Sequence, residues 1–156
     1  MKGWLLERDV SEMNLVLNLA RQHATADSAP IAARIIDPFG VHNLCFVNHL
    51  SRHENVLGHA ELLCLSEIQR TSVGVDFSQL TMYVTLEPCP MCAWALRSVG
   101  IGRVVFGAYN SKYGAAGSVY DFLRSGATGY SSTEVVGGVL ERECGELLTH
   151  FFEGVR

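Results

Sequence analysis

The sequence lacks the features of a membrane-spanning or secreted protein. A membrane span needs about 18 consecutive apolar residues, and no stretch of the sequence approaches that length. The N-terminal stretch has acidic residues where a secretory signal needs an unbroken apolar core. The five cysteines are an odd number without regular spacing outside one CxxC pair, which argues against a disulfide framework and for a reducing compartment. We therefore expect a cytoplasmic protein with no membrane partner.

Basic residues are also few. The chain has 12 Lys and Arg against 16 Asp and Glu, which gives a net charge of −4. Proteins that attract nucleic acid over long distances usually carry the opposite sign, so a nucleic-acid substrate would have to be held by a local basic patch. No low-complexity run is present, and 48% of the 156 residues are hydrophobic, so we expect a single globular domain spanning residues 1–156.

Hydrophobic periodicity predicts a layered α/β domain, in which a hairpin precedes strands that alternate with helices. The predicted helices are 10–23, opened by a capping box of Asp9 and Glu12, then 59–69, 90–99, a short one at 119–124, and 138–152. The predicted strands are 31–36 and 41–48, joined by a turn at 37–40, then 80–86, 103–107 and 134–136, with loops at 51–58 and 109–118. The resulting sheet is partly parallel.

The segment TLEPCPMCAW holds the CxxC pair, Cys89 and Cys92, at the start of a predicted helix. A redox role would need a thioredoxin-like context, in which the pair follows a strand early in the chain. A structural zinc site would need a fourth protein ligand, usually from a second CxxC or an HxxxH. Neither motif is present. Cys45, Cys64 and Cys144 are isolated in the sequence, and an isolated cysteine is more often a buried apolar residue than a metal ligand.

His59, Ala60 and Glu61 open another predicted helix. Residues two apart do not share a helix face, so the histidine can bind a metal while the carboxylate stays free, although an acidic residue there also suits a plain helix N-terminus. Together with Cys89 and Cys92, His59 makes three ligands and leaves one position open, as in catalytic zinc sites.

The combination H-x-E and P-C-x-x-C is the signature of zinc-dependent nucleobase deaminases. It predicts one Zn²⁺ held by His59, Cys89 and Cys92, with water in the open position. Glu61 is then the catalytic general acid and base, which takes a proton from the water and passes it to a ring nitrogen and to the departing amine.

From about residue 30 to residue 152 the sequence resembles the bacterial tRNA-specific adenosine deaminases. That family converts the wobble adenosine of a tRNA anticodon to inosine as a homodimer, and has a three-layer α/β/α cytidine-deaminase-like fold with a mixed five-stranded sheet. The resemblance rests on the zinc segments 59–61 and 85–93, on 101–108 followed by Lys112 and 114–118, and on 138–144 with Phe151 and Phe152.

The resemblance implies several substrate contacts. Asn48 would hydrogen-bond the purine edge, Ile31, Leu86 and the Ala60 backbone would wall the base pocket, and Lys112 would meet a phosphate of the anticodon stem-loop. Without the resemblance, Ile31 and Leu86 are better explained as core residues, and Asn48 as a turn residue at the end of a strand. Four aromatic residues are candidates for stacking on neighbouring bases: Tyr109, Tyr113, Tyr120 and Phe152.

Asn110 stands where the family usually has an acidic residue. A carboxylate there would accept a hydrogen bond from a ribose 2′-hydroxyl, whereas the amide of Asn110 accepts without the charge. We therefore expect weaker discrimination of RNA over DNA than is usual for the family.

Two other functions remain open at this point. The first is a deaminase of a free base or nucleoside, of the guanine or cytosine type, which would suit the acidic net charge. The second is a non-catalytic, zinc-stabilised binding module, against which the presence of Glu61 argues.

Overall fold

The computed structural model describes residues 3–25, 28–49, 55–124 and 132–154. It contains one sheet whose strands are β1 (Ala32–Ile36), β2 (Asn43–Val47), β3 (Thr81–Leu86), β4 (Arg103–Ala108) and β5 (Glu134–Val136). Its helices are α1 (Gly3–Gln22), α2 (Ala60–Thr71), α3 (Pro90–Ser98) and α4 (Glu141–Gly154), with a 3-10 turn at Phe77–Gln79. No described helix combines the length and the apolar character needed to cross a bilayer.

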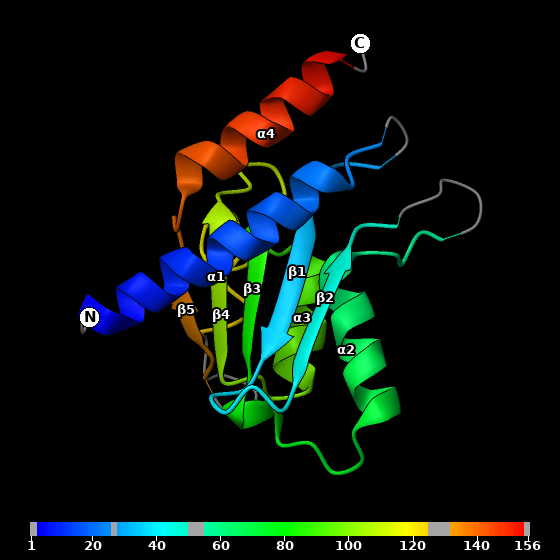
Figure 1. Ribbon diagram of the computed structural model, residues 1–156, viewed down its shortest axis with the longest axis vertical. Coiled ribbons are helices and arrows are strands. Elements are labelled where there is room, and N and C mark those ends of the chain that lie inside the picture. The colour runs from blue at the N-terminus through cyan, green and yellow to red at the C-terminus, as the bar shows by residue number, and fades with distance from the viewer. Residues whose placement is uncertain (1–2, 26–27, 50–54, 125–131, 155–156) are drawn as a thin grey trace.

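The strands lie in the order β2-β1-β3-β4-β5 (Figure 1). β1 pairs antiparallel with both β2 and β3, while β3–β4 and β4–β5 are parallel. The expected hairpin and partly parallel sheet are therefore confirmed. Because β3 and β4 run in the same direction, the residues that follow them, 87–89 and 109–118, meet at the end of the sheet where the carboxyl ends of these strands lie.

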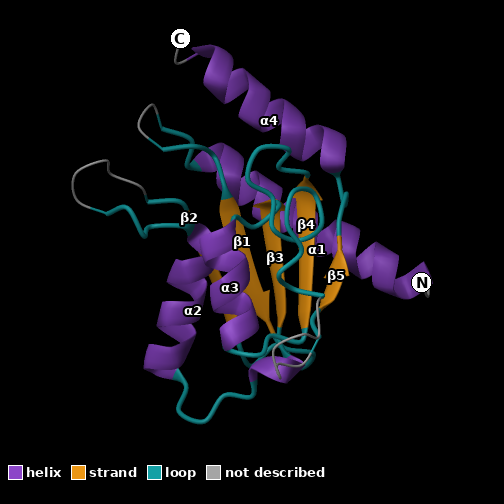
Figure 2. Ribbon diagram, turned by 180° about the vertical axis from the view of Figure 1, so that it is seen from behind, coloured by secondary structure: helices purple, strands orange, loops and turns teal. Residues whose placement is uncertain are grey.

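Helices cover both faces of the sheet. α1 and α4 lie on one face, and α2 and α3 lie on the other, as the two opposite views show (Figures 1 and 2). Successive side chains of the central strands point to opposite faces of the sheet and belong to two separate hydrophobic cores. Met82 and Val84 of β3 pack under α2 and α3, whereas Tyr83 packs under α1. The predicted α/β/α layering is confirmed.

The predicted start of the first helix is wrong. α1 begins at Gly3, so Asp9 lies within the helix and does not cap it. The side chain of Asp9 is fully buried and accepts two hydrogen bonds from Arg103, at 2.7 and 2.8 Å, and one from the hydroxyl of Tyr83 at 2.8 Å. Glu12 forms an ion pair with Arg34 at 3.1 Å. Both acids therefore tie α1 to the sheet, which a local capping pattern does not reveal.

Two further predictions are wrong. Residues 119–124 are described but form no helix; they are an irregular segment with an isolated bridge between Ala116 and Asp121. The last helix begins at Glu141 and not at Gly138, because Gly138 and Leu140 have φ of 82° and 56°, outside the right-handed helical region. The other helices, strands and the turn at 37–40 agree with the predictions to within three residues, and of the predicted loop at 51–58 only 55–58 lies within the described residues.

Candidate active site

Two helix N-termini bring the predicted metal ligands together on the α2–α3 side of the sheet. His59 is the N-cap residue of α2, and Cys89 is the N-cap residue of α3, with Pro90 in the first helical turn. Proline favours that position, because its missing N–H would be unpaired there in any case. Cys92 lies in the first turn of α3 and is fully buried.

The donor atoms of these three residues fit a metal ion. The ring nitrogen of His59 and the sulfurs of Cys89 and Cys92 all lie within 4.8 Å of one another, and the Cys89 sulfur is 3.8 Å from Nδ1 of His59. Metal–ligand bonds of about 2.0–2.3 Å in a tetrahedral site place ligand atoms roughly 3.5–4 Å apart. One imidazole and two thiolates are a donor set suited to Zn²⁺.

The electrostatics of the cluster favour a thiolate at Cys89. Hydrogen bonds from the Cys92 thiol and from His59 lower the pKa of Cys89 to about 4. The hydrogen bond that Cys92 donates, together with burial, raises the pKa of Cys92, and the contact with Cys89 raises the pKa of His59. Metal coordination requires both thiols to be deprotonated, so ion binding releases the proton that Cys92 otherwise holds.

Glu61 lies beside the ligands without belonging to the metal-binding group. It occupies the first turn of α2, and only 4% of it is exposed. Burial raises the pKa of Glu61 to about 7. A carboxyl group whose pKa is near the working pH is suited both to accept and to donate a proton.

A cavity of about 150 Å³ opens onto this cluster. Its lining includes His59, Glu61 and Cys89 on the metal side. The other lining residues are Ile31, Asn48, Leu86, Glu87, Asn110 and Tyr113. Four of the residues predicted to contact substrate, namely Ile31, Asn48, Leu86 and Asn110, therefore surround one cavity with the metal cluster.

Asn48, which lines the cavity, is hydrogen-bonded to Ala60 behind it. The backbone N–H of Ala60 donates to Oδ1 of Asn48 at 2.9 Å, so this side chain satisfies one of the free N–H groups at the start of α2. The amide nitrogen of Asn48 is then the group that remains to donate a hydrogen bond. Ala60 is fully buried and is not among the residues that line the cavity.

The model of the cytidine and deoxycytidylate deaminase zinc-binding region matches residues 6–108, about two thirds of the chain. This region contains the three clustered ligands and Glu61. The chain belongs to the cytidine and deoxycytidylate deaminase family.

Relatives within this deaminase family support the resemblance found in the sequence. The tRNA-specific adenosine deaminase of Haemophilus influenzae is 34% identical over 152 residues, which cover 94% of this chain and 84% of the relative. The Bacillus subtilis tRNA-specific adenosine deaminase is 41% identical over 100 residues; that match spans 64% of this chain and 62% of the relative's length.

Solved structures agree with the deaminase fold. A tRNA:A34 deaminase, studied for A-to-I editing at the wobble position of transfer RNA, matches with a TM-score of 0.77 and 31% identity over 87% of this chain and 97% of its own. A guanine deaminase from Nitrosomonas europaea matches with a TM-score of 0.74 at 23% identity over 91% of this chain and 83% of its own. The second likeness concerns the fold alone.

Lys112, which was predicted to meet a phosphate, does not line the cavity, and its phosphate contact stays a prediction. Its ammonium group lies 4.9 Å from the centre of the Tyr113 ring, in a cation–π contact. Of the four aromatic residues considered for stacking, Tyr113 is the one that lines the cavity. Tyr109 packs edge-on against Phe106, with ring centres 5.1 Å apart.

The structure changes the interpretation of Asn110. Its side-chain oxygen accepts hydrogen bonds from the backbone N–H groups of Lys112, at 3.3 Å, and Tyr113, at 3.0 Å. This oxygen was expected to be the acceptor that replaces the usual carboxylate, but the turn already occupies it. The amide NH₂ group of Asn110 is what remains for a substrate, so the residue presents a donor.

Glu87 also lines the cavity, and no sequence motif predicted a role for it. It is 1% exposed and accepts hydrogen bonds from three backbone N–H groups of the 109–118 loop, those of Asn110, Ala116 and Ser118. An acidic residue directly before Pro88-Cys89 was visible in the sequence. Its partners, which lie 23 to 31 residues further along the chain, were not.

Proposed function

We propose that this chain, as one zinc-dependent deaminase domain, hydrolyses the wobble adenosine of a tRNA anticodon to inosine and releases ammonia. The observation that carries the proposal is the buried, unligated carboxylate of Glu61 beside three metal ligands at the end of a cavity of about 150 Å³. The substrate comes from the relatives, which are named tRNA-specific adenosine deaminases.

His59, Cys89 and Cys92 would hold one Zn²⁺ per subunit. When bound, the ion supplies Lewis acidity that lowers the pKa of a water molecule and makes it a nucleophile at neutral pH. Glu61 accepts a proton from the attacking water and delivers it to N1 of the purine. The C6–O bond forms in this step. Glu61, again a carboxylate, then takes the proton of the new C6 hydroxyl and passes it to N6, so that the C6–N6 bond breaks and the amine leaves as ammonia.

The other wall of the cavity orients the base. The NH₂ group of Asn48 donates to an acceptor on the purine edge, because the side-chain oxygen is held by Ala60. Ile31 and Leu86 line the cavity and supply apolar surface to the flipped base. An adenosine in an anticodon loop suits this arrangement, because unstacking a loop base costs no more than a few kcal/mol.

We also propose that the protein works as a homodimer in the cytoplasm. The outer side of α3 exposes Met91 and Trp94, and the ring of Trp94 lies edge-on to Phe122 with centres 6.0 Å apart. Tyr120, also exposed, stacks on Phe122 and extends the same apolar surface. A second copy that covers this surface would remove it from water, and sedimentation of the zinc-loaded protein measures whether it does so.

The test of the activity uses zinc-loaded protein with two classes of substrate. One is an anticodon stem-loop RNA with adenosine at the wobble position, and the other is a set of free bases and nucleosides, namely adenosine, guanine and cytosine. Inosine and ammonia are measured with the zinc content of the same sample. We expect inosine in the stem-loop, loss of activity with a chelator, and recovery with added Zn²⁺.

The same experiment distinguishes the alternatives. Ammonia released from free bases alone would replace the tRNA substrate by a free-base one and overturn the proposal. No turnover of any substrate in a sample with one zinc per chain would favour a binding module.

A further inference from the structure

One buried carboxylate, that of Glu87, connects the metal side of the cavity to the loop at residues 109–118. Glu87 follows β3 and precedes Cys89 by two residues. Its Oε1 accepts from the N–H groups of Ala116 and Ser118 at 3.0 Å each, and its Oε2 accepts from the N–H of Asn110 at 3.0 Å and from the Ser118 hydroxyl. The carboxylate therefore holds the loop at both ends.

These donors take the place of a charged partner. Among the described residues, no Lys, Arg or His forms an ion pair with Glu87. A buried carboxylate costs free energy unless hydrogen bonds replace its hydration, and hydrogen bonds to a charged acceptor are the stronger kind. The loop also leaves room for the carboxylate, because a Cβ on Gly114 would clash with it.

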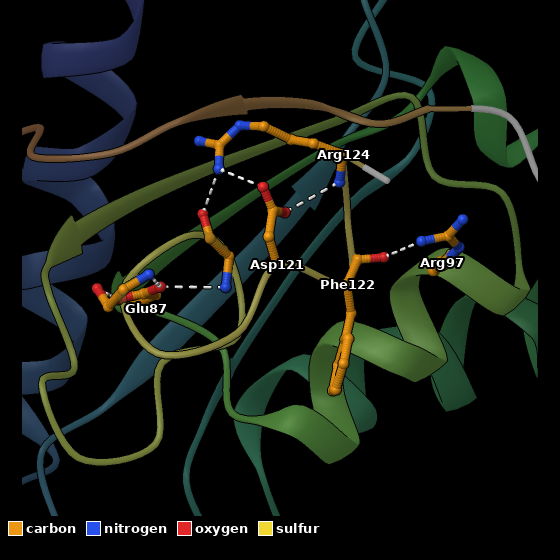
Figure 3. A network of polar contacts seen from close by, with 7 residues as sticks. Glu87, Arg97, Asp121, Phe122 and Arg124 are labelled. Atoms are coloured by element: carbon orange, nitrogen blue, oxygen red, sulfur yellow. Dashed lines mark hydrogen bonds and ion pairs between the residues drawn. The ribbon is translucent and has the colours of Figure 1, made fainter. Parts of the chain in front are cut away.

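The residues that follow the loop, 119–124, have polar contacts of their own (Figure 3). Arg124 donates to the carbonyl oxygen of Ala116 at 2.7 Å and pairs with Asp121 at 3.3 Å. Arg97 of α3 donates to the carbonyl oxygen of Phe122. Arg97 thus anchors residue 122 to α3 without Glu87. Nearer the cavity, Glu87 holds the loop together with the backbone N–H of Ala115, which donates to the carbonyl oxygen of Pro88 at 2.9 Å.

The contacts of Glu87 lead directly to the cavity wall. Its carboxylate binds the N–H of Asn110, whose own side chain binds the N–H of Tyr113. Glu87, Asn110 and Tyr113 all line the cavity. We infer that Glu87 is a positioning residue, which sets the places of Asn110 and Tyr113 and so controls the affinity for the nucleic-acid substrate. This inference rests on the proposed function.

The variant Glu87→Gln tests this role, because it keeps the shape of the side chain but turns one acceptor oxygen into an NH₂ group that faces N–H donors. With the stem-loop substrate we expect the KM to rise about tenfold, as for a lost hydrogen bond to a charged group. The zinc content should be unchanged and kcat should change by less than about twofold, because the ligands and Glu61 are untouched. The matched control is Glu146→Gln, which removes the same charge from an exposed site on α4.

A second measurement needs no substrate. Hydrogen exchange of the backbone amides of Asn110, Ala116 and Ser118 should accelerate about tenfold in Glu87→Gln, while exchange in β3 stays unchanged. The milder variant Ser118→Ala, which removes only the hydroxyl contact, should raise the KM about twofold and serves if Glu87→Gln fails to fold. Unchanged exchange, or an effect on kcat alone, would overturn the role of Glu87.

A double variant tests whether Glu87 acts through Tyr113. If it does, Glu87→Gln combined with Tyr113→Ala raises the KM by less than the product of the two single effects. Multiplicative effects would overturn the inference. A wild-type protein that leaves the stem-loop unchanged would instead overturn the proposed function, while the exchange measurement still reports on Glu87.

Discussion

The two walls of the cavity are built in different ways. The metal wall consists of two helix N-termini, so His59, Glu61, Cys89 and Cys92 owe their places to short stretches of regular backbone. The other wall, made of the remaining lining residues, is assembled from segments far apart in sequence, around Ile31, Asn48, Leu86 and the 109–118 loop. Under the proposed function, the metal wall carries the chemistry and the other wall selects the substrate. Substitutions on the two walls should therefore affect different kinetic constants.

The largest effect is expected on the metal wall, from Glu61→Gln. The amide cannot accept the proton of the attacking water, so kcat should fall by about 10²–10⁴-fold, the usual contribution of a general acid or base. The zinc content should stay at one ion per chain, because Glu61 is not a ligand. Steady-state inosine formation and metal analysis measure both quantities. The control is Glu67→Gln, at a partly exposed position of α2 where the side chain pairs with Arg70. Full activity in Glu61→Gln would refute the mechanism.

A smaller effect is expected on the other wall, from Asn48→Ala. The substitution removes the donor for the purine edge and leaves the N–H of Ala60 without its acceptor. We expect the KM for the stem-loop to rise about tenfold, with a smaller change in kcat. Asn48→Asp is the matched control, because it keeps an acceptor for Ala60. If Asn48→Asp binds the stem-loop as tightly as wild type, the NH₂ group of Asn48 does not recognise the base.

A change of a few-fold is expected from Asn110→Asp. One carboxylate oxygen can keep the turn to Lys112 and Tyr113, and the other replaces an NH₂ donor by an acceptor for a ribose 2′-hydroxyl. The variant should prefer RNA over DNA about threefold more strongly than wild type, roughly the worth of one exposed hydrogen bond. Rates on matched RNA and DNA hairpins measure the ratio. A wild-type preference equal to or greater than that of the variant contradicts the prediction.

No effect on activity is expected at the other end of the sheet, from Asp37→Asn. Asp37 accepts backbone hydrogen bonds from Phe39, Val41 and His42 at 2.6–3.2 Å and so holds the β1–β2 turn. Burial raises its pKa, but these hydrogen bonds outweigh burial and bring the pKa below the ordinary value of 3.8.

Because the pKa of Asp37 is lower in the folded state, the stability it adds is complete above about pH 4 and is lost as the pH falls through the folded pKa. The uncharged amide of the Asp37→Asn variant cannot make this contribution, so the Tm difference between wild type and variant should be largest near neutral pH and shrink below about pH 3.8. Thermal denaturation at several pH values measures it. A constant difference down to about pH 2 would contradict the assignment.

Asp37 and Glu87 also show how far the sequence could predict this molecule. Both are buried acids that hold a loop through backbone N–H groups. The partners of Asp37 lie two to five residues away, so the turn at 37–40 was predictable from the residues themselves. The partners of Glu87 lie 23 to 31 residues away and become neighbours only because β3 and β4 run parallel. No local pattern encodes that distance.

The sequence by itself determined the order of most helices and strands and pointed to His59, Cys89 and Cys92, whose donor atoms the structure brings together, because these features depend on periodicity and on short motifs at the starts of helices. Only the tertiary structure decided that Asp9 is a buried partner of Arg103, that the oxygen of Asn110 is used by its own turn, and that Glu87 joins the two walls. Those contacts form between segments brought together by the sheet, and the free energy that places them comes from packing the whole domain.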